Sequence, residues 1–207
     1  MKIAIVPGNL FIITAASGAG KTSLVKEILA RDAQIKLSVS HTTRQPRIGE
    51  NNGEHYQFVT SDAFAQILNA GGFLESANVH GAQYGTSQAD VDAFLQAGHD
   101  VILEIDWQGA AQVRKLYPQS IGIFILPPSI DALAQRLNNR NQDSIVVINK
   151  RVAAARDEMR HVVEFDYVTI NDSFDVALQD LLAIIRAHRL TATVQIQRYH
   201  ALVQTLI

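Results

Sequence analysis

The sequence predicts an α/β fold with a five-stranded parallel sheet flanked by helices. Near-continuous apolar segments, typical of buried strands, occur at residues 10–14, 100–106 and 120–126. Residues 35–40 add a short alternating segment, and residues 162–170 contain the last predicted strand. Between them, apolar residues recur at helical spacing. At 207 residues and 47% hydrophobic content, the chain is long enough for one sizeable core that carries inserted lobes.

Composition restricts the partners that we expect. The net charge is −2 and the isoelectric point is near 6.4, so the chain has no general electrostatic attraction to nucleic acid or membranes. It contains no cysteine, which suits a cytoplasmic protein, and its seven histidines lack the spacing of a metal site. An anion site must therefore rest on local positive charge, which points to small phosphates as ligands.

The first predicted strand leads into a small-residue turn and then a helix, the order that a phosphate-binding loop requires. The segment LFIITAASGAGKTSL spans Leu10 to Leu24, and from Thr22 onward apolar residues recur at helical spacing. Small residues let backbone N–H groups approach a phosphate, and the helix dipole favours the anion. Lys21 adds a charge, and the Thr22 hydroxyl is a ligand for Mg²⁺. These features predict a P-loop that holds a triphosphate.

The match to G-x-x-x-x-G-K-[ST] has one departure, because Ala15 stands at the first glycine position. Alanine can serve there if its φ is negative. The alternative is a glycine-rich turn with an incidental lysine, which the flanking strand and helix disfavour.

Residues 41–52 predict a surface loop, since the segment HTTRQPRIGENN contains two arginines, a proline and a glycine with almost no apolar residue. We expect Arg44 and Arg47 to project from it. A solvated basic turn is the alternative, which becomes weaker beside a phosphate loop.

Residues 54–98 predict a small α+β insertion. A strand at 54–60 is followed by a helix capped by Ser61, strand-like pieces from Phe73 to Tyr84 broken at Gly81, and a helix capped by Thr86 or Ser87. The polar and aromatic residues of this insertion are open to a functional role or to ordinary packing: Tyr56, Glu75 and Tyr84.

Acidic residues stand at the carboxyl end of the apolar segment 100–106. In a parallel sheet this end faces the ligand crevice, so Asp106 is the first candidate for a place near Mg²⁺ or substrate and Glu104 the second. The alternative is solubility at a strand end. We interpret Trp107 as a packing residue.

A helical segment at 131–160 is rich in basic residues, and a lid that closes on a triphosphate needs several arginines. A solvated helical face is the alternative for some of them. Six of the 18 basic residues lie in this segment: Arg136, Arg140, Lys150, Arg151, Arg156 and Arg160. From Phe174 a long helix closes the core, and the tail beyond Arg186 is open to a role in homo-oligomer formation.

Four segments together resemble the guanylate kinase family. They are ASGAGKT at Ala16 to Thr22, SHTTRQPRIGENNGEHYQF at Ser40 to Phe58, FLESANVHGAQYGTS at Phe73 to Ser87, and LEIDWQGA at Leu103 to Ala110. The resemblance extends from Leu10 to about Asp172, nearly the full chain. It implies a P-loop core with an inserted GMP-binding lobe and a helical lid.

The resemblance also implies the reaction and the residues that perform it. The family transfers the γ-phosphoryl group of ATP to GMP with Mg²⁺. By resemblance, ATP is held by Ala15, Ala16, Ser17, Gly18, Ala19, Gly20, Lys21, Thr22 and Asn171, with Thr22 at the metal. GMP is held by Ser40, Arg44, Arg47, Glu50, Tyr56, Glu75, Tyr84, Thr86 and Asp106. Catalysis falls to Lys21, Arg44, Arg136, Arg140 and Arg151.

The expected domain limits are 1–38, 91–129 and 161–207 for the core, 39–90 for the GMP-binding lobe and 130–160 for the lid. Besides Ala15, the chain departs from the family at Glu104, where aspartate is usual, at Asn141, where glycine is usual, and at residues 145–147, where acidic residues are common.

Two other functions are open. A guanylate-kinase-like binding module without catalysis would typically lack a working phosphate loop, whereas Lys21 and Thr22 are present here. A P-loop kinase for another small molecule is disfavoured by Glu75, since a carboxylate pairs with the N–H donors of guanine and repels adenine.

Overall fold

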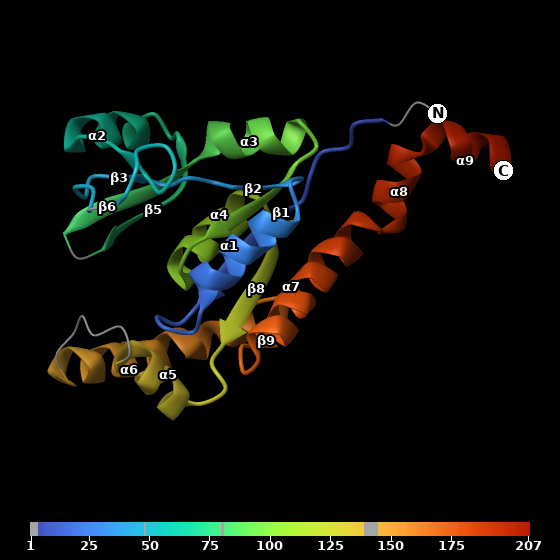
Figure 1. Ribbon diagram of the computed structural model, residues 1–207. Helices are drawn as coiled ribbons and strands as arrows, with labels where there is room; N and C mark the ends of the chain where they lie inside the picture. Colours follow the sequence, from blue (N-terminus) through green and yellow to red (C-terminus); the bar gives the residue numbers. More distant parts are fainter. Residues whose placement is uncertain (1–3, 48, 80, 139–144) are drawn as a thin grey trace.

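A five-stranded parallel sheet forms the centre of the protein, as predicted. The computed structural model describes residues 4–47, 49–79, 81–138 and 145–207 (Figure 1), without the side chains of 145–150. The strands lie in the order β2-β7-β1-β8-β9, and each neighbouring pair is parallel. Their bounds are β1 (Leu10–Ala15), β2 (Ile35–Leu37), β7 (Asp100–Glu104), β8 (Ile121–Leu126) and β9 (Tyr167–Ile170).

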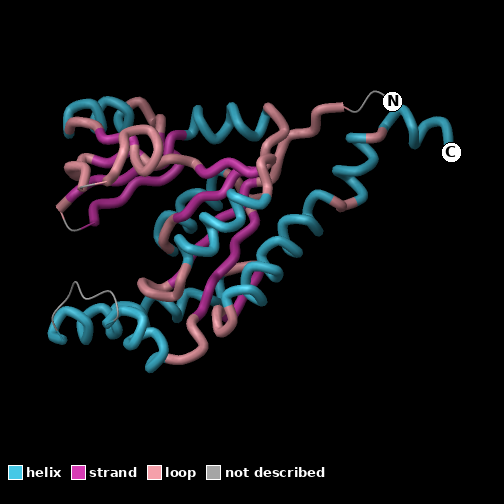
Figure 2. The backbone as a smooth tube through the Cα atoms, in the orientation of Figure 1, coloured by secondary structure: helices cyan, strands magenta, loops and turns pink. Residues whose placement is uncertain are grey.

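Helices cover both faces of this sheet (Figure 2). Alternate residues of a strand point to opposite faces, and β1 follows this rule. Phe11 and Ile13 pack with α1 (Lys21–Arg31) and α7 (Phe174–Arg189). Leu10 and Ile12 pack on the other face with α3 (Gln88–Gln96) and α4 (Trp107–Leu116). Both faces of β1 are therefore buried, which explains its apolar sequence from Leu10 to Ile13.

The inserted lobe contains a second sheet in the order β4-β3-β6-β5. Its strands are β3 (His41–Thr42), β4 (Gln57–Phe58), β5 (Phe73–Val79) and β6 (Ala82–Ser87), and α2 (Ser61–Asn69) lies beside them. The prediction of a surface loop over residues 41–52 was wrong for its first two residues, which form β3. Thr42 is fully buried and pairs with Tyr84 of β6. The strand predicted at 54–60 is confined to 57–58, and α2 is capped by Thr60 in place of Ser61.

A pair of helices, α5 (Ile130–Asn138) and α6 (Ile145–Met159), follows β8, and η1 (Arg160–Glu164) leads from α6 back to the core. Figure 1 shows this pair and the inserted lobe as two arms that project on the same side of the core. We call α5 and α6 the lid. Arg140 and Asn141 lie outside the described residues, and so do the side chains of 145–147.

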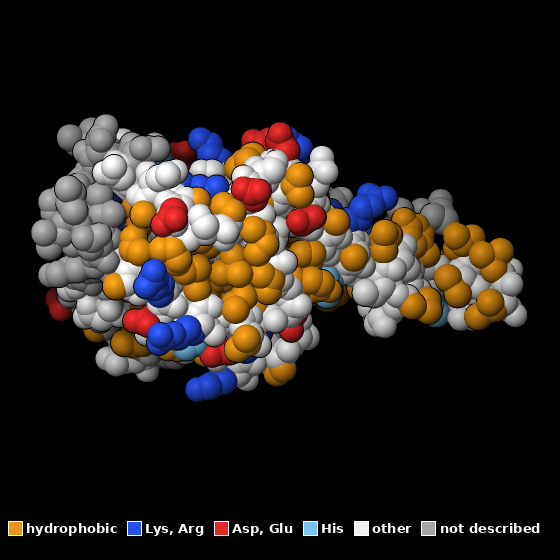
Figure 3. Space-filling model, turned by 90° about the horizontal axis from the view of Figure 1, so that it is seen from below, with side chains coloured by type: hydrophobic (Ala, Val, Ile, Leu, Met, Phe, Trp, Pro, Cys, Tyr) orange, Lys and Arg blue, Asp and Glu red, His pale blue; other side chains and the backbone are white. Residues whose placement is uncertain are grey.

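Two short helices, α8 (Ala192–Arg198) and α9 (His200–Leu206), form a narrow extension at the opposite end of the molecule (Figures 1 and 3). The N–H of Ala4 donates to the carbonyl of Arg198 at 3.1 Å. The role of this tail in oligomer formation stays a prediction. Among the described helices, none has both the length and the apolar character needed to cross a membrane.

Candidate functional site

The phosphate loop follows β1 directly and ends at the first residue of α1. Gly18 and Gly20 have φ values of 92° and 100°, the left-handed region that only glycine adopts without strain. Ala15 is still the last residue of β1, where the backbone is extended. Alanine is tolerated at this position of the motif because no positive φ is required there.

Asn171, which follows β9, stabilises the phosphate loop through its side chain. Its side-chain amide donates to the carbonyl of Ala19 at 2.7 Å and is buried. A Cβ atom on Gly20 would lie 2.3 Å from the same amide nitrogen. Arg136 of α5 donates to the carbonyls of Ala19 at 3.3 Å and Asn171 at 2.8 Å. The sequence indicated Asn171 and Arg136 as ligand contacts, but their part in shaping the loop depends on strand β9 lying beside β8.

Lys21 and Thr22 begin α1 at the rim of this loop. The Lys21 ammonium donates to the carbonyl of Ile105 at 3.2 Å. Burial lowers the pKa of Lys21, and the carboxylates of Glu104, Asp106 and Glu158 oppose that shift. The Thr22 hydroxyl donates to the Glu104 carboxylate.

The pairing of Thr22 with Glu104 suits Mg²⁺. Both side chains present hard oxygen donors, and Mg²⁺ needs few protein ligands because water and phosphate oxygens complete its octahedron. The described part of the chain has no group of three or more His, Cys, Asp or Glu side chains that could hold a metal without such help. The residues therefore fit a metal ion that arrives with the nucleotide.

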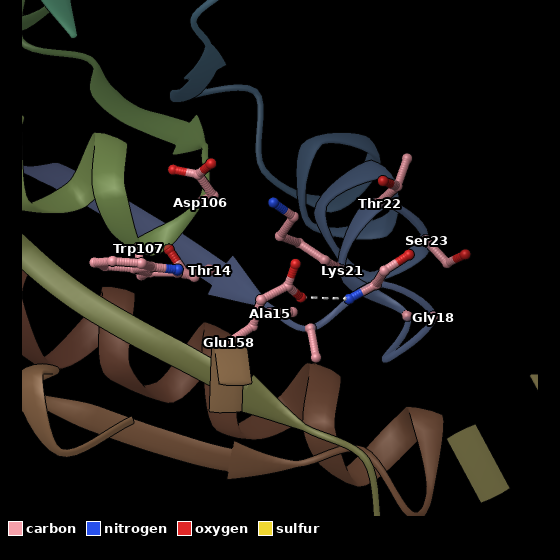
Figure 4. Close-up of a pocket in the computed structure, with 12 residues that line it drawn as sticks. Thr14, Ala15, Gly18, Lys21, Thr22, Ser23, Asp106, Trp107 and Glu158 are labelled. Atoms are coloured by element: carbon pink, nitrogen blue, oxygen red, sulfur yellow. Dashed lines mark hydrogen bonds between the residues drawn. The ribbon is translucent and has the colours of Figure 1, made fainter. Parts of the chain in front are cut away.

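The lid contacts the phosphate loop directly (Figure 4). The Arg151 guanidinium donates to the Ser17 hydroxyl at 2.8 Å, and the Ser17 backbone N–H donates to the Glu158 carboxylate at 3.1 Å. Arg151 was a predicted site residue, whereas Glu158 was missed. The only sequence signal for Glu158 is its position seven residues after Arg151, which places both on one face of a helix.

Trp107 lines the pocket around this loop. Its ring stacks on His161 of η1, with ring centroids 3.5 Å apart and planes 8° from parallel. The stack joins the start of α4 to the point where the lid rejoins the core, which agrees with the packing role predicted for Trp107.

A second pocket opens in the inserted lobe beside the carboxyl end of β7. The polar side chains that line it come from three strands and three loops: Ser40, Tyr56, Glu75, Tyr84, Glu104 and Asp106. Glu75 and Thr86 are cross-strand partners in β5 and β6, and the Thr86 hydroxyl donates to the Glu75 carboxylate at 2.6 Å. Burial raises the pKa of Glu75.

Arg44 is held in place at the edge of this pocket. It donates to Glu50 at 2.8 Å and lies over the Tyr56 ring, 5.3 Å from its centroid. The N–H of Arg47 donates to the other oxygen of Glu50 at 2.8 Å. The hydrogen bonds from Arg44 and Arg47 lower the pKa of Glu50 to about 2. Arg44 does not project freely as predicted, because its side chain is only 18% exposed; the Arg47 side chain is exposed.

Asp106 joins the two pockets, since it lines both of them. Its carboxylate caps α4 by accepting the N–H of Gly109 at 2.8 Å. A phosphate held by the loop would therefore face a polar pocket that contains a buried carboxylate. This geometry can hold two phosphate-bearing ligands end to end.

Comparison with known proteins agrees with this geometry. The family model described as guanylate kinase matches residues 8–188. A guanylate kinase of Methylobacillus flagellatus is 66% identical over 200 residues, covering 97% of this chain and 99% of the relative. One from Thiobacillus denitrificans is 55% identical over 196 residues, covering 95% and 94%. The crystal structure of guanylate kinase from Anaplasma phagocytophilum matches with a TM-score of 0.73 at 28% identity, covering 90% and 89%.

Proposed function

This chain belongs to the guanylate kinase family, and we propose from that premise that it transfers the γ-phosphoryl group of ATP to GMP, giving ADP and GDP. The observation that carries the proposal is the junction at Asp106, where the phosphate-loop pocket meets the pocket that contains Glu75. A transferase for two nucleotides needs two such sites that face each other.

In the proposed complex the ATP phosphates lie on the backbone N–H groups of the loop. Lys21 adds a fixed charge beside them. Thr22 and Glu104 would hold Mg²⁺, which screens the phosphate charge when it is bound. Asn171 and Arg136 keep the loop in shape through the Ala19 carbonyl.

GMP would occupy the second pocket with its phosphate toward the loop. Arg44, Arg47, Tyr56 and Tyr84 would bind the phosphate, and Glu50 positions the two arginines. The base would lie beside four polar side chains: Ser40, Glu75, Thr86 and Asp106. The carboxylate of Glu75 can accept the N1–H and N2–H donors of guanine, whereas adenine presents an acceptor at N1.

The reaction needs no strong general base, since the attacking GMP phosphate oxygen is already anionic. It forms a bond to the γ-phosphorus of ATP as the bond from that phosphorus to the β,γ-bridging oxygen breaks, and ADP carries away the electron pair. The barrier lies in bringing two polyanions together in line. We assign that task to the arginines, Arg44 from the inserted lobe and Arg136, Arg140 and Arg151 from the lid.

We propose that residues 39–90 form the GMP-binding lobe and residues 130–160 the lid, with 1–38, 91–129 and 161–207 as the core. The two arms project on the same side of the core (Figure 1), which supports closure of both over their ligands.

A coupled ADP-release assay with Mg-ATP and each of GMP, AMP, CMP and UMP tests the proposal. Turnover should depend on GMP and disappear in Lys21→Ala. The matched control is Lys26→Ala, which removes an exposed lysine of the same helix and should keep wild-type turnover. GMP binding without turnover for any acceptor would favour the non-catalytic binding module.

A further inference from the structure

Two polar groups of Ser17, its hydroxyl and its backbone N–H, are bound by the lid. Arg151 donates to its hydroxyl, and Glu158 accepts its backbone N–H. Arg151 and Glu158 are seven positions apart on α6, and two helical turns place them on the same face. One face of α6 therefore makes two hydrogen bonds to a single residue of the phosphate loop.

Glu158 puts a carboxylate where the loop offers a donor to anions. The backbone N–H groups of such a loop bind phosphate oxygens, and here the Ser17 N–H is already bound at 3.1 Å. Glu158 lines the same pocket as Gly18, Lys21 and Thr22. Figure 4 shows its side chain pointing into that pocket from the lid, with the bond to the loop drawn as a dashed line.

Apolar packing fixes this arrangement. Ala16 of the loop is buried in a cluster with Leu133 and Leu137 of α5 and Ala155 of α6. Ala155 lies on α6 between Arg151 and Glu158 and is fully buried. This packing holds α6 against the loop and thereby keeps Glu158 beside Ser17.

We propose that Glu158 is an internal competitor for the nucleotide phosphates, which holds α6 against the loop until a phosphate displaces it. An N–H that is shared between two acceptors binds each of them more weakly, and a carboxylate and a phosphate that both contact this N–H repel each other. Nucleotide binding must therefore release Glu158, so the residue lowers the affinity for phosphate-bearing ligands and couples their arrival to the position of the lid. The inference rests on the proposed assignment of this loop to ATP.

Isothermal titration with ADP, in the absence of acceptor, tests this role in the full-length chain. Glu158→Gln keeps the size of the side chain and removes its charge, and Glu158→Ala removes the acceptor altogether. We expect both variants to bind ADP about tenfold more tightly than wild type, the effect of losing a competing charge-assisted hydrogen bond. The matched control is Asp157→Asn, which removes the adjacent acid, 72% exposed and paired with Arg160 at 3.1 Å, and should bind like wild type.

Two results would overturn the inference. If Glu158→Gln and Glu158→Ala bind ADP with wild-type or weaker affinity while wild type binds normally, Glu158 is no competitor and the proposed function stands. An equal gain in Asp157→Asn would assign the effect to general charge. A wild-type chain that binds no ADP would overturn the proposed function, and the inference with it.

Discussion

Replacing Glu75 by alanine should weaken the preference for GMP over AMP. Glu75 is 6% exposed, and one of its carboxylate oxygens already accepts the Thr86 hydroxyl. Each carboxylate oxygen can accept two hydrogen bonds, so capacity remains for the N1–H and N2–H donors of guanine. With alanine at this position, buried guanine donors lose their acceptors, and adenine loses the group that repels it.

The size of the effect follows from the burial of this site. A hydrogen bond to a charged group contributes about 1.5–3 kcal/mol, and water cannot fully replace a partner in a closed pocket. Loss of one such bond gives about 1.5–3 kcal/mol in kcat/KM for GMP, which is roughly a 10- to 150-fold decrease, and loss of both bonds gives a larger one. The value of kcat/KM for AMP should stay constant or rise. Glu75→Gln keeps one acceptor and should show a smaller loss.

The assay is ADP release with GMP or AMP as acceptor, with Glu54→Ala as a control, because that variant removes an exposed acid of the same lobe. Burial raises the pKa of Glu75, so its carboxylate gains a proton at a higher pH than ordinary acids. The GMP KM should therefore increase as the pH falls, more steeply in wild type than in Glu75→Ala. An unchanged ratio of GMP to AMP turnover in Glu75→Ala would remove Glu75 from the base site.

Three further substitutions test the loop, the arginine site and the core. Gly20→Ala should abolish ADP binding in a titration, since the new Cβ would lie 2.3 Å from the Asn171 amide and φ is 100°. Arg44→Ala should lower kcat/KM for GMP by about 100-fold or more in the ADP-release assay, because a charged contact to the phosphate is lost. Arg189→Ala should lower the free energy of unfolding in urea by about 3 kcal/mol, because it leaves Asp100, whose side chain is 5% exposed, without its ion pair at 2.5 Å.

Each of these has a result that would contradict it. Tight ADP binding by Gly20→Ala would show that the loop does not hold the phosphates. Near-normal GMP turnover in Arg44→Ala would end its assignment to GMP. A wild-type urea midpoint for Arg189→Ala would mean that Asp100 is satisfied by Asn9 alone, whose backbone and side-chain N–H groups donate to it at 2.7 and 2.9 Å.

The central sheet could be predicted from the sequence because each of its main strands can be recognised from its own run of apolar residues. A strand that is buried on both faces is largely apolar, and the central residues of β1, β7 and β8 are apolar. The strand β3 could not be found this way. Thr42 is buried in a polar segment because it pairs with Tyr84, far along the chain, and no local period records that pairing.

The residues of the candidate site also fall into those that a local motif indicates and those whose role depends on contacts between distant segments. Motif spacing indicated Lys21, Thr22 and Arg44, since their neighbours in sequence define the loops that carry them. The support given by Asn171 arises from the order of strands in the sheet, and the contact of Glu158 from the docking of a helix. Such contacts between distant segments become visible only when the chain is folded.

The stack of Trp107 on His161 has a practical consequence. Trp107 is the single tryptophan of the chain, and its partner ring lies at the joint between α6 and the core. Indole emission depends on what lies against the ring, so a rotation of α6 that slides the two rings apart would change the emission of the unlabelled protein. The fluorescence of Trp107 therefore reports the position of α6 relative to the core. The inserted lobe has no tryptophan and adds no background emission.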